Sequence, residues 1–371
     1  MKKLTAIILC LMLTLVMAVG CAAEKPEEAP APEKVETPAE KPAEKAPAEA
    51  APAEFDPSKH KLGFVNDLGG HFVHQTLRYA FQTKAEELGY EYVPIVTSGT
   101  DWQELASMVM AAIADGVTGI AFWSDAANVG LMSDATEAGA VCVNMGFEIP
   151  KDSGAQLVAS LPFKSYDYGQ LGAEKMVGKL KADGIESGTI GISQGSFNTT
   201  ENNNAQGFID YIKKNNPEYT CLEVIEEGFE TSTAQSKIVA LIQANADTIV
   251  GGYTTTGNGA INWCAAADSI DMKGKLVIIG EDYSSVTLGL VESGELYGFM
   301  AEPLIEVATC AAETLDKALR GEEVEYFEYF TTPFVGKEDL APYKDIVANV
   351  EKMYGDDYGA NGKWIEVLTG G

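Results

Sequence analysis

The stretch KLGFVNDLGGHF, residues 61–72, sets a pattern that the rest of the chain repeats. Residues 62–65 form a short apolar run, which predicts a buried strand. A turn rich in Gly and Asn follows. Phe72 then begins a segment with apolar residues at near-helical spacing that stops at Gly89, which predicts a helix over 72–88. A strand, a turn and a helix therefore follow one another at the start of the body.

The same unit returns along the chain and starts again near residue 189. Consecutive units of this kind, with continuous apolar strands, predict parallel sheets covered by helices on both faces. Two such runs predict an α/β protein of two doubly wound, Rossmann-like lobes. No Pro/Gly-rich linker separates them, so several short crossings are expected to join the lobes. The further strands are expected at 90–96, 118–123, 140–145, 156–161, 189–193, 221–226, 248–252, 276–279 and 296–301, and the further helices at 101–114, 205–214, 233–244, 260–267 and 284–291.

The N-terminal segment is typical of an export signal and not of the fold. Two lysines precede an apolar run over 4–17, which is short for a membrane span, and small residues follow it. Cys21 comes directly after them, as in the lipobox of bacterial lipoproteins, which predicts a signal peptide over 1–20 and a lipid on the Cys21 sulfur. The alternative is an ordinary signal peptide that contains a cysteine. Residues 21–58 are rich in Ala, Pro and Glu, which predicts a semi-rigid tether.

The charge balance disfavours several classes of partner. The chain has 26 Lys and Arg against 55 Asp and Glu, a net charge of −29, which argues against nucleic acid because phosphate binding needs clustered basic residues. Arg78 and Arg320 are the only arginines, so an anionic ligand is disfavoured as well. The three histidines have no Cys or carboxylate cluster beside them, so no metal and no cofactor are expected. Buried free thiols, with two disulfides as the alternative, are expected for Cys142, Cys221, Cys264 and Cys310.

The segments that follow the predicted strands carry the chemistry of a ligand site. In parallel sheets of this kind, ligands bind beyond the carboxyl ends of the strands. The segments at those ends are rich in Asn, Asp, Glu, Thr and aromatic residues and contain no Lys or Arg. Acids and amides pair with adjacent hydroxyls, and aromatic faces cover the C–H side of a ring, so the mixture favours a neutral polyhydroxyl ligand. The alternative is that these polar residues only cap the following helices.

Enzyme motifs are present only in incomplete form. Residues 191–195, GISQG, match the G-x-S-x-G elbow of serine hydrolases, but every histidine lies upstream of Ser193, where that order of residues has no base. The loop 252–258 has the glycine spacing of a phosphate loop, but its last residue is Asn where Lys is required. Glu281 and Asp282 are adjacent, so on extended backbone their carboxylates are expected to point apart. We therefore expect a binding protein and not an enzyme.

From residue 60 to about 335 the sequence resembles the periplasmic binding proteins of the ribose and galactose type, the sugar receptors of ABC importers. The resemblance implies two lobes that close on a sugar, with three crossings near 161–162, 302–303 and 329–333. It implies an N-terminal lobe of 59–161 and 303–330 and a C-terminal lobe of 162–302 and 331–371. The motifs that carry it, in order, are GFVN at 63–66 with Phe72, DGVTGI at 115–120, GTIG at 188–191 with Gly207 and Phe208, IIGED at 278–282, and MAEP at 300–303.

The resemblance also implies which residues contact the ligand. Two departures from the family pattern leave open a modified sugar, a sugar alcohol or another neutral polar solute: Asn144-Met145 replaces an Asp-Arg pair, and Asn202 lies where many relatives have an arginine. Trp123 is either an aromatic platform or a core residue. The implied ligand-binding residues are Asn66, Phe72, Trp102, Asn144, Phe147, Asn202, the stacking aromatic Phe229, Tyr253 or Thr254 as polar contacts, the hydroxyl-binding acid Asp282, and the polar hinge residue Glu302.

The implied function is capture of a neutral sugar or polyol by hinge closure and delivery to the permease subunits of an ABC transporter. A lipid on Cys21 would hold the protein, expected as a monomer, on the outer face of the cytoplasmic membrane. Two alternatives remain at this point. One is a receptor that reports the ligand to a sensor kinase or chemoreceptor, and the other is a surface hydrolase.

Overall fold

The computed structural model describes residues 55–97, 99 and 101–355. The predicted signal peptide, the predicted lipidation site Cys21 and the tether up to residue 54 lie outside the described residues, as does the end of the tail from residue 356. Within the described part, no helix combines the length and the apolar character needed to cross a membrane.

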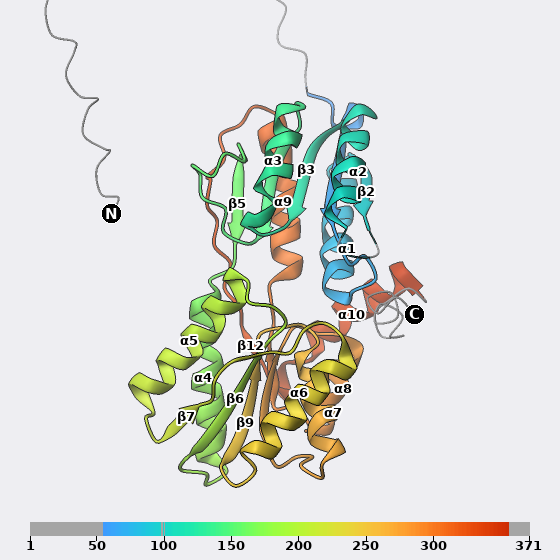
Figure 1. Ribbon diagram of the computed structural model, residues 1–371. Helices are drawn as coiled ribbons and strands as arrows, with labels where there is room; N and C mark the ends of the chain where they lie inside the picture. Colours follow the sequence, from blue (N-terminus) through green and yellow to red (C-terminus); the bar gives the residue numbers. More distant parts are fainter. Residues whose placement is uncertain (1–54, 98, 100, 356–371) are drawn as a thin grey trace, which may run out of the picture. The chain divides into compact units, whose positions relative to one another are not determined.

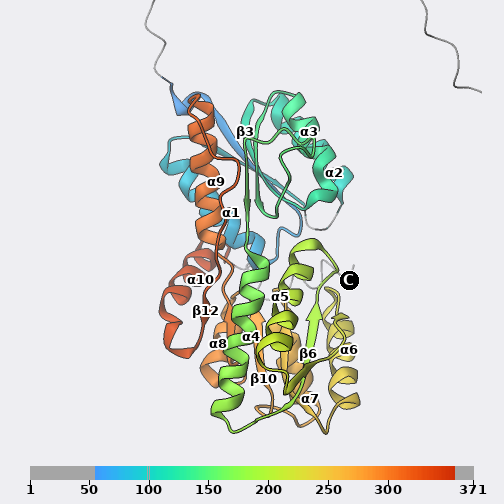
Figure 2. The same cartoon turned by 90° about the vertical axis from the view of Figure 1, so that its left-hand side faces the viewer.

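The first part of the body folds into an α/β lobe, called the N-lobe from here on. Its elements are η1 (Pro57–Lys59), β1 (Lys61–Asn66), α1 (Phe72–Glu87), β2 (Glu91–Val96), α2 (Trp102–Ala114), β3 (Val117–Trp123), η2 (Ala126–Asn128), α3 (Val129–Glu137), β4 (Val141–Gly146), β5 (Ala159–Pro162) and, later in the chain, α9 (Leu304–Leu319). The strands form a parallel sheet in the order β2-β1-β3-β4-β5. Leu62 and Phe64 of β1 pack with α1 and α9, whereas Val65 packs with α2 and α3 on the opposite face. Figure 2 shows these two helix pairs on either side of β3.

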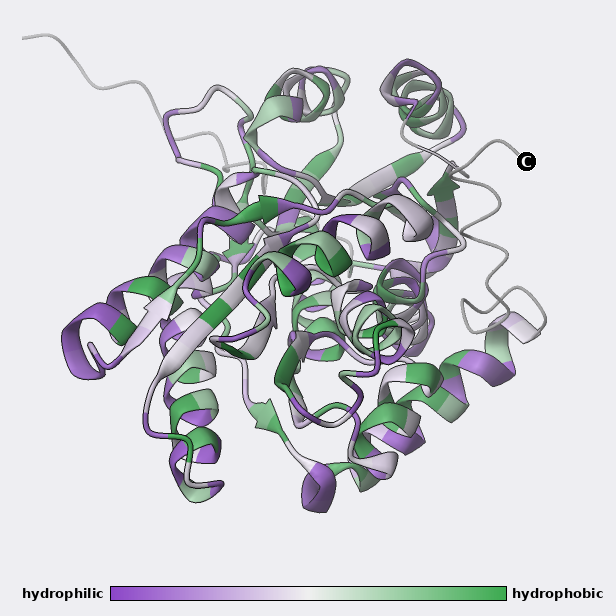
Figure 3. Cartoon of the chain, turned by 60° about the horizontal axis from the view of Figure 1, so that its bottom comes forward, coloured by the Kyte–Doolittle hydropathy of each residue, from purple (hydrophilic) through white to green (hydrophobic). Residues whose placement is uncertain are grey.

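The second lobe, called the C-lobe, repeats this architecture. Its elements are α4 (Ser165–Ala182), β6 (Gly188–Gln194), α5 (Thr199–Asn215), β7 (Tyr219–Cys221), β8 (Ile225–Glu226), α6 (Thr231–Ala244), β9 (Ile249–Thr254), α7 (Gly259–Ser269), β10 (Val277–Glu281), α8 (Ser285–Ser293), β11 (Gly298–Met300), β12 (Phe334–Val335) and η3 (Lys337–Asp339). The sheet order is β12-β11-β10-β9-β6-β7, with β8 also paired to β6 and only β12 antiparallel among the described strands. Helices α4 and α5 cover one face, and α6 and α7 the other (Figure 1). The helices alternate hydrophilic and hydrophobic positions, as amphipathic helices on a sheet do (Figure 3).

The chain crosses between the two sheets three times. The crossings lie between β5 and α4, between β11 and α9, and between α9 and β12. The last crossing runs beside the first, because Ser160 and Phe163 form isolated bridges to Phe327 and Phe330. The three-crossing hinge expected from the sequence is therefore present, close to Pro162, Pro303 and Pro333.

The last described helix, α10 (Ala341–Tyr354), contacts both lobes. Near its start, Tyr343 packs edge-on against Tyr283 and Phe299 of the C-lobe, with ring centroids 4.9 and 5.6 Å apart. Near its end, the Tyr354 ring lies 4.5 Å from the Arg78 guanidinium of α1 in the N-lobe. The tail assigned from the sequence to the C-lobe alone thus also packs on the N-lobe.

Two expected elements differ from the structure in ways that matter for the site. The strand expected over 221–226 is divided into β7 and β8, because Ser193 pairs with Ile225 while Ile190 pairs with Cys221, which leaves one extra residue between them. The helix expected over 205–214 begins earlier, at Thr199, behind the capping residue Asn198. The four cysteines of the described body are free; Cys142 and Cys264 are buried as expected, whereas Cys221 and Cys310 are only partly buried.

Candidate functional site

A cavity of about 430 Å³, called the cleft from here on, lies between the lobes at the carboxyl ends of both parallel sheets. The N-lobe supplies the loops after β1, β3 and β4 and the start of α2. The C-lobe supplies the loops after β6, β8, β9 and β10, and Glu302 comes from the crossing after β11. The cleft is therefore at the edge that the βα alternation predicts.

Several polar residues of these loops cap helices, as the alternative interpretation of the sequence expects. Asp101 accepts from the amides of Gln103 and Glu104 at the start of α2, both at 3.0 Å. Asn198 caps α5, and Glu230 accepts from two amides of α6. Capping and cleft lining are not exclusive, because Asn198 does both.

The N-lobe wall contains two histidines that carry no charge. His71 caps α1 by accepting from the Val73 amide at 3.3 Å, and its ring stacks on Phe72 with centroids 4.6 Å apart. His74 lies beside Asp67, with its Nδ1 3.6 Å from the carboxylate. Burial lowers the pKa of His71 to about 3, and it also lowers the pKa of His74. Both imidazoles are therefore neutral at physiological pH.

Aromatic side chains line the cleft from both lobes. Trp123 packs edge-on against Phe147, with ring centroids 5.3 Å apart, and Trp102 is the first residue of α2. Phe229 faces the cleft from the C-lobe and is 43% exposed. Trp123, for which the sequence left two interpretations, is half-buried and lines the cleft.

In the C-lobe wall, Glu201 holds the β6–α5 loop in place. Its carboxylate accepts from the amides of Gly195 (2.7 Å) and Ser196 (3.3 Å) and from the side chains of Asn198 (2.8 Å) and Thr255 (2.9 Å). Burial raises the pKa of Glu201 to about 7, although these donors favour the charged form. Glu201 is thus a structural member of the cleft wall with its lone pairs in use.

A group of three buried acids, Glu281, Asp282 and Glu302, lies at the base of the cleft. They are 4%, 4% and 8% exposed. Burial and the neighbouring charge of Glu302 raise the pKa of Glu281 and of Asp282 well above the usual range of carboxyl groups. Burial also raises the pKa of Glu302 to about 7. These carboxyl groups therefore hold protons to unusually high pH.

Polar neighbours, of which Asn204 lines the cleft and Tyr168 and Tyr253 lie behind it, position two of these acids. Glu281 accepts from Asn204 Nδ2 at 3.1 Å, and Asn204 Oδ1 accepts in turn from the Tyr253 hydroxyl at 2.6 Å. Glu302 accepts from the Tyr168 hydroxyl at 3.3 Å. One oxygen of Asp282, Oδ1, is buried without a hydrogen-bond partner. A hydrogen-bond donor placed in the cleft would supply the missing partner of this oxygen.

The expectation that Glu281 and Asp282 point apart is wrong. Both line the cleft. The reason is the backbone of Asp282, which has φ of 60°, in the left-handed region, so the extended alternation of β10 ends between the two residues.

The structure brings five of the eleven predicted ligand-binding residues to the cleft: Trp102, Phe147, Phe229, Asp282 and Glu302. The next five are buried and lie outside the lining, at its edges or behind it: Asn66, Phe72, Asn144, Tyr253 and Thr254. Some of these support the wall, since Asn144 Nδ2 donates to the Phe147 carbonyl at 3.1 Å.

The eleventh residue, Asn202, is exposed and lies outside the lining, where it donates to the Phe197 carbonyl at 3.1 Å. The early start of α5 explains this position. Within the helix, Glu201 and Asn204 are three apart and share the inward face, whereas Asn202 points outward. The cap at Asn198 followed by Glu three residues later is a capping-box signal that could have located both inward residues.

The lobes touch beside the cleft. A side-chain carbon on Gly257, after β9, would lie 3.0 Å from Asp282 Oδ2 and 3.4 Å from both His71 and Phe72 of the N-lobe. The start of α1 therefore packs closely against the β9–α7 loop of the C-lobe. Only glycine fits here without displacing these neighbours.

Two other chemistries find no support at the site. Ser193 of the G-x-S-x-G motif is fully buried, accepts a hydrogen bond from Trp263 Nε1 at 2.8 Å and lies outside the cleft lining. Within the described ranges, no group of three His, Cys, Asp or Glu side chains is arranged to hold a metal ion.

A model of the periplasmic binding protein domain family matches residues 62–323. No curated protein sequence gives a match. A sugar-binding protein of a sugar ABC transporter from Bacillus halodurans is similar in structure, with TM-score 0.70 and 17% identity over 76% of this chain and 100% of that one.

Two further solved structures have the same fold. A carbohydrate transporter solute-binding protein from Agrobacterium radiobacter, in complex with D-arabinose, gives TM-score 0.69 and 19% identity over 78% of this chain and 99% of that one. An ABC transporter solute-binding protein from Agrobacterium vitis with bound D-fucose gives TM-score 0.66 and 21% identity over 78% of this chain and 99% of that one. At such identities the likeness concerns the fold.

Proposed function

The chain belongs to the family of periplasmic binding protein domains, and we propose that it captures a hydroxyl-rich solute, a sugar or related polyol, in the cleft and delivers it to the permease of an ABC transporter. The observation that carries this proposal is the cleft itself, to which both lobes contribute hydrogen-bonding side chains and aromatic faces. The sugars named with two structural relatives support the ligand class.

In the proposed mechanism the ligand bridges the two lobes. Phe229 and the N-lobe aromatic residues cover the C–H faces of the ring, and Asp282 and Glu302 accept from its hydroxyls. Glu302 belongs to a crossing, so a contact there acts directly on the hinge. Because the ligand gains contacts on both walls only when the lobes are together, it favours the closed arrangement. The closed lobes then dock on the permease.

The binding step is tested by isothermal titration of the full chain against a panel of sugars and polyols, neutral and amine-bearing, with small-angle scattering in parallel. We expect heat from at least one member and a smaller radius of gyration in its presence. Heat from an organic acid, with none from any sugar or polyol, would overturn the proposal.

We also propose that Cys21 carries a lipid that anchors the protein to the outer face of the cytoplasmic membrane, with the segment to residue 58 as a tether. Cys21→Ala is expected to move the protein from the membrane fraction to the medium and to abolish labelling by radioactive palmitate. An unlabelled wild-type chain would show that the segment is an ordinary signal peptide.

A further inference from the structure

The cleft carries an excess of acid that a neutral ligand does not explain. Six of its lining residues are acids, and no Lys or Arg is among the described residues that line it. Its two histidines are neutral because burial lowers their pKa. Arg78 lies one turn beyond His74 on α1, but it does not line the cleft, because its guanidinium packs over the ring of Tyr354.

The six acids are not equivalent. Asp67 lies beside His74, Asp125 caps η2, and Glu201 accepts four hydrogen bonds. The remaining acids form the buried group of Glu281, Asp282 and Glu302. Their hydrogen bonds come only from Asn204, from Tyr168 and from one another, and Asp282 Oδ1 has none. An isolated buried carboxylate is strongly unfavourable unless it is paired or protonated. Burial and mutual repulsion raise the pKa of all three groups, so protonation is one way to relieve the conflict.

A positively charged ligand resolves the conflict more directly. It lets a carboxyl group of this set ionise, since the carboxylate then interacts with an opposite charge in a poorly hydrated site, while its neighbours can keep their protons. Aromatic rings also attract a cation to their faces, and four of them line the cleft: Trp102, Trp123, Phe147 and Phe229. A metal ion needs several oxygen ligands around it, and no such group was found among the described residues. An organic cation fits both the acids and the rings.

We propose that the natural ligand is a sugar or polyol that carries a protonated amine, and that the ammonium group is held by Asp282, Glu302 and Glu281 at the base of the cleft. This inference rests on the proposed function, because it assumes that the cleft binds a hydroxyl-rich solute. It replaces the neutral ligand expected from the sequence with a cationic one. Other polar side chains of the lining, such as Thr256, remain for the ligand hydroxyls.

The experiment compares matched ligands by isothermal titration of the full chain at pH 7.5. The probes are D-glucosamine, D-galactosamine and D-mannosamine, each with its hydroxyl parent and its N-acetyl derivative. We expect at least one amine to bind ten times or more tightly than both of its neutral counterparts. Equal or tighter binding of the neutral forms would overturn this inference and leave the proposed function standing. Absence of binding by every sugar, amine-bearing or neutral, would overturn both.

A charge-removing variant ties the effect to the buried acids. Asp282→Asn keeps the side-chain shape, and Asn tolerates the left-handed backbone at this position. We expect it to reduce the preference for the amine over its hydroxyl parent at least fivefold. Asp268→Asn on α7, outside the cleft, changes the net charge equally and should leave the preference unchanged. An equal loss in both variants would attribute the preference to overall charge and overturn the inference. Tighter binding of putrescine, which has no hydroxyl, would overturn the sugar part of it.

Discussion

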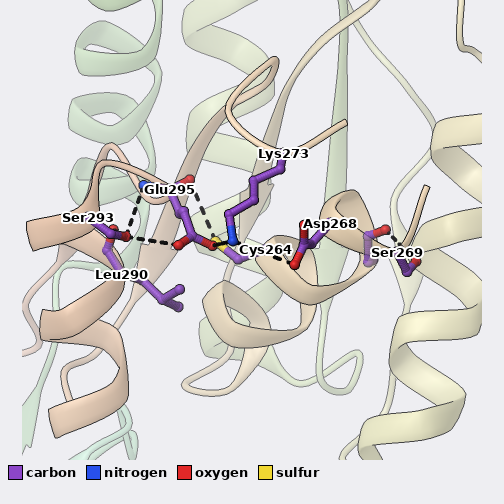
Figure 4. Close-up of polar contacts among 8 residues, drawn as sticks. Cys264, Asp268, Ser269, Lys273, Leu290, Ser293 and Glu295 are labelled. Carbon is purple, nitrogen blue, oxygen red and sulfur yellow. Dashed lines mark hydrogen bonds and ion pairs between the residues drawn. The ribbon is translucent and has the colours of Figure 1, made fainter. Parts of the chain in front are cut away.

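Acidic residues at the two ends of the C-lobe sheet differ in whether a cation lies beside them. At the amino ends of β10 and β11, Lys273 forms ion pairs with two acids (Figure 4). Its Nζ lies 3.5 Å from Asp268 and 3.0 Å from Glu295. At the carboxyl ends of the same strands, Glu281 and Asp282 line the cleft, whose described lining contains no Lys or Arg.

The difference shows which acids serve the fold and which do not. The paired acids at the amino end are hydrated and contribute little, but they do not oppose folding. The buried acids at the carboxyl end oppose it, because they lose water without gaining a cation. Packing gives no reason for acids there, so we attribute them to the ligand.

The largest expected effect on stability concerns two glycines of α4, one near the cleft and one farther from it. A side-chain carbon on Gly169 would lie 2.0 Å from the Asn204 carbonyl of α5, whereas one on Gly178 would meet nothing within 4 Å. Gly169→Ala is expected to lower the free energy of unfolding by about 3 kcal/mol, because α4 and α5 must separate. Gly178→Ala should raise it by about 0.5–1 kcal/mol through helix propensity. Urea denaturation measures both, and similar effects would mean that the cleft end is no more tightly packed.

The next effect is a pH dependence set by Glu302, which faces Tyr168 of α4, Asp282 and Glu281 after β10, and Glu201 of α5. Its pKa is raised in the folded state to about 7, so the fold binds an extra proton between pH 4.5 and 7 and loses stability as pH rises through that range. Glu302→Gln should therefore raise the unfolding free energy of the ligand-free protein by about 2 kcal/mol at pH 8 and change it little at pH 4.5.

Thermal and urea unfolding at the two pH values measure this difference. The variant should also bind the ligand more weakly, so that a gain in stability accompanies a loss in affinity. Lower stability of Glu302→Gln at pH 8 would mean that the carboxylate is compensated within the protein.

Local signals in the sequence predicted the parallel strands and helices α1, α2 and α5 to α8, but not helices α3, α4, α9 and α10 or strand β12. The apolar run at 62–65, the helical spacing after Phe72 and the stop at Gly89 predict β1 and α1 because each signal is local. The division between β7 and β8 was missed because it depends on pairing with β6, whose partner residues lie just over 30 positions upstream. The contact of α10 with both lobes is likewise set by tertiary packing and has no local signature.

The site was predicted less well because its residues depend on backbone geometry at the ends of elements. The loops were identified correctly as the cleft edge. However, α5 begins earlier than predicted, so Glu201 and Asn204 line the cleft and Asn202 does not. Because the backbone of Asp282 is left-handed, the side chains of Glu281 and Asp282 both reach the cleft. The regular alternation of side chains along a strand predicts the opposite. Tyr253, which the sequence offered with Thr254 as a polar contact, lies outside the cleft lining and donates to Asn204.

The smallest expected effect tests whether the contrast between the two ends is local. The hydrogen bond from Lys273 lowers the pKa of Glu295, so its contribution is present above the unfolded pKa and is lost as pH falls, the opposite of Glu302. Glu295→Gln should lower the unfolding free energy by about 0.5 kcal/mol or less at pH 7, and 1 M salt should remove the effect. In a chain of net charge −29, removal of any acid also relieves general repulsion. If Glu295→Gln stabilised the protein as much as Glu302→Gln does, general repulsion would explain both results, and the burial of unpaired acids at the cleft would need no ligand to account for it.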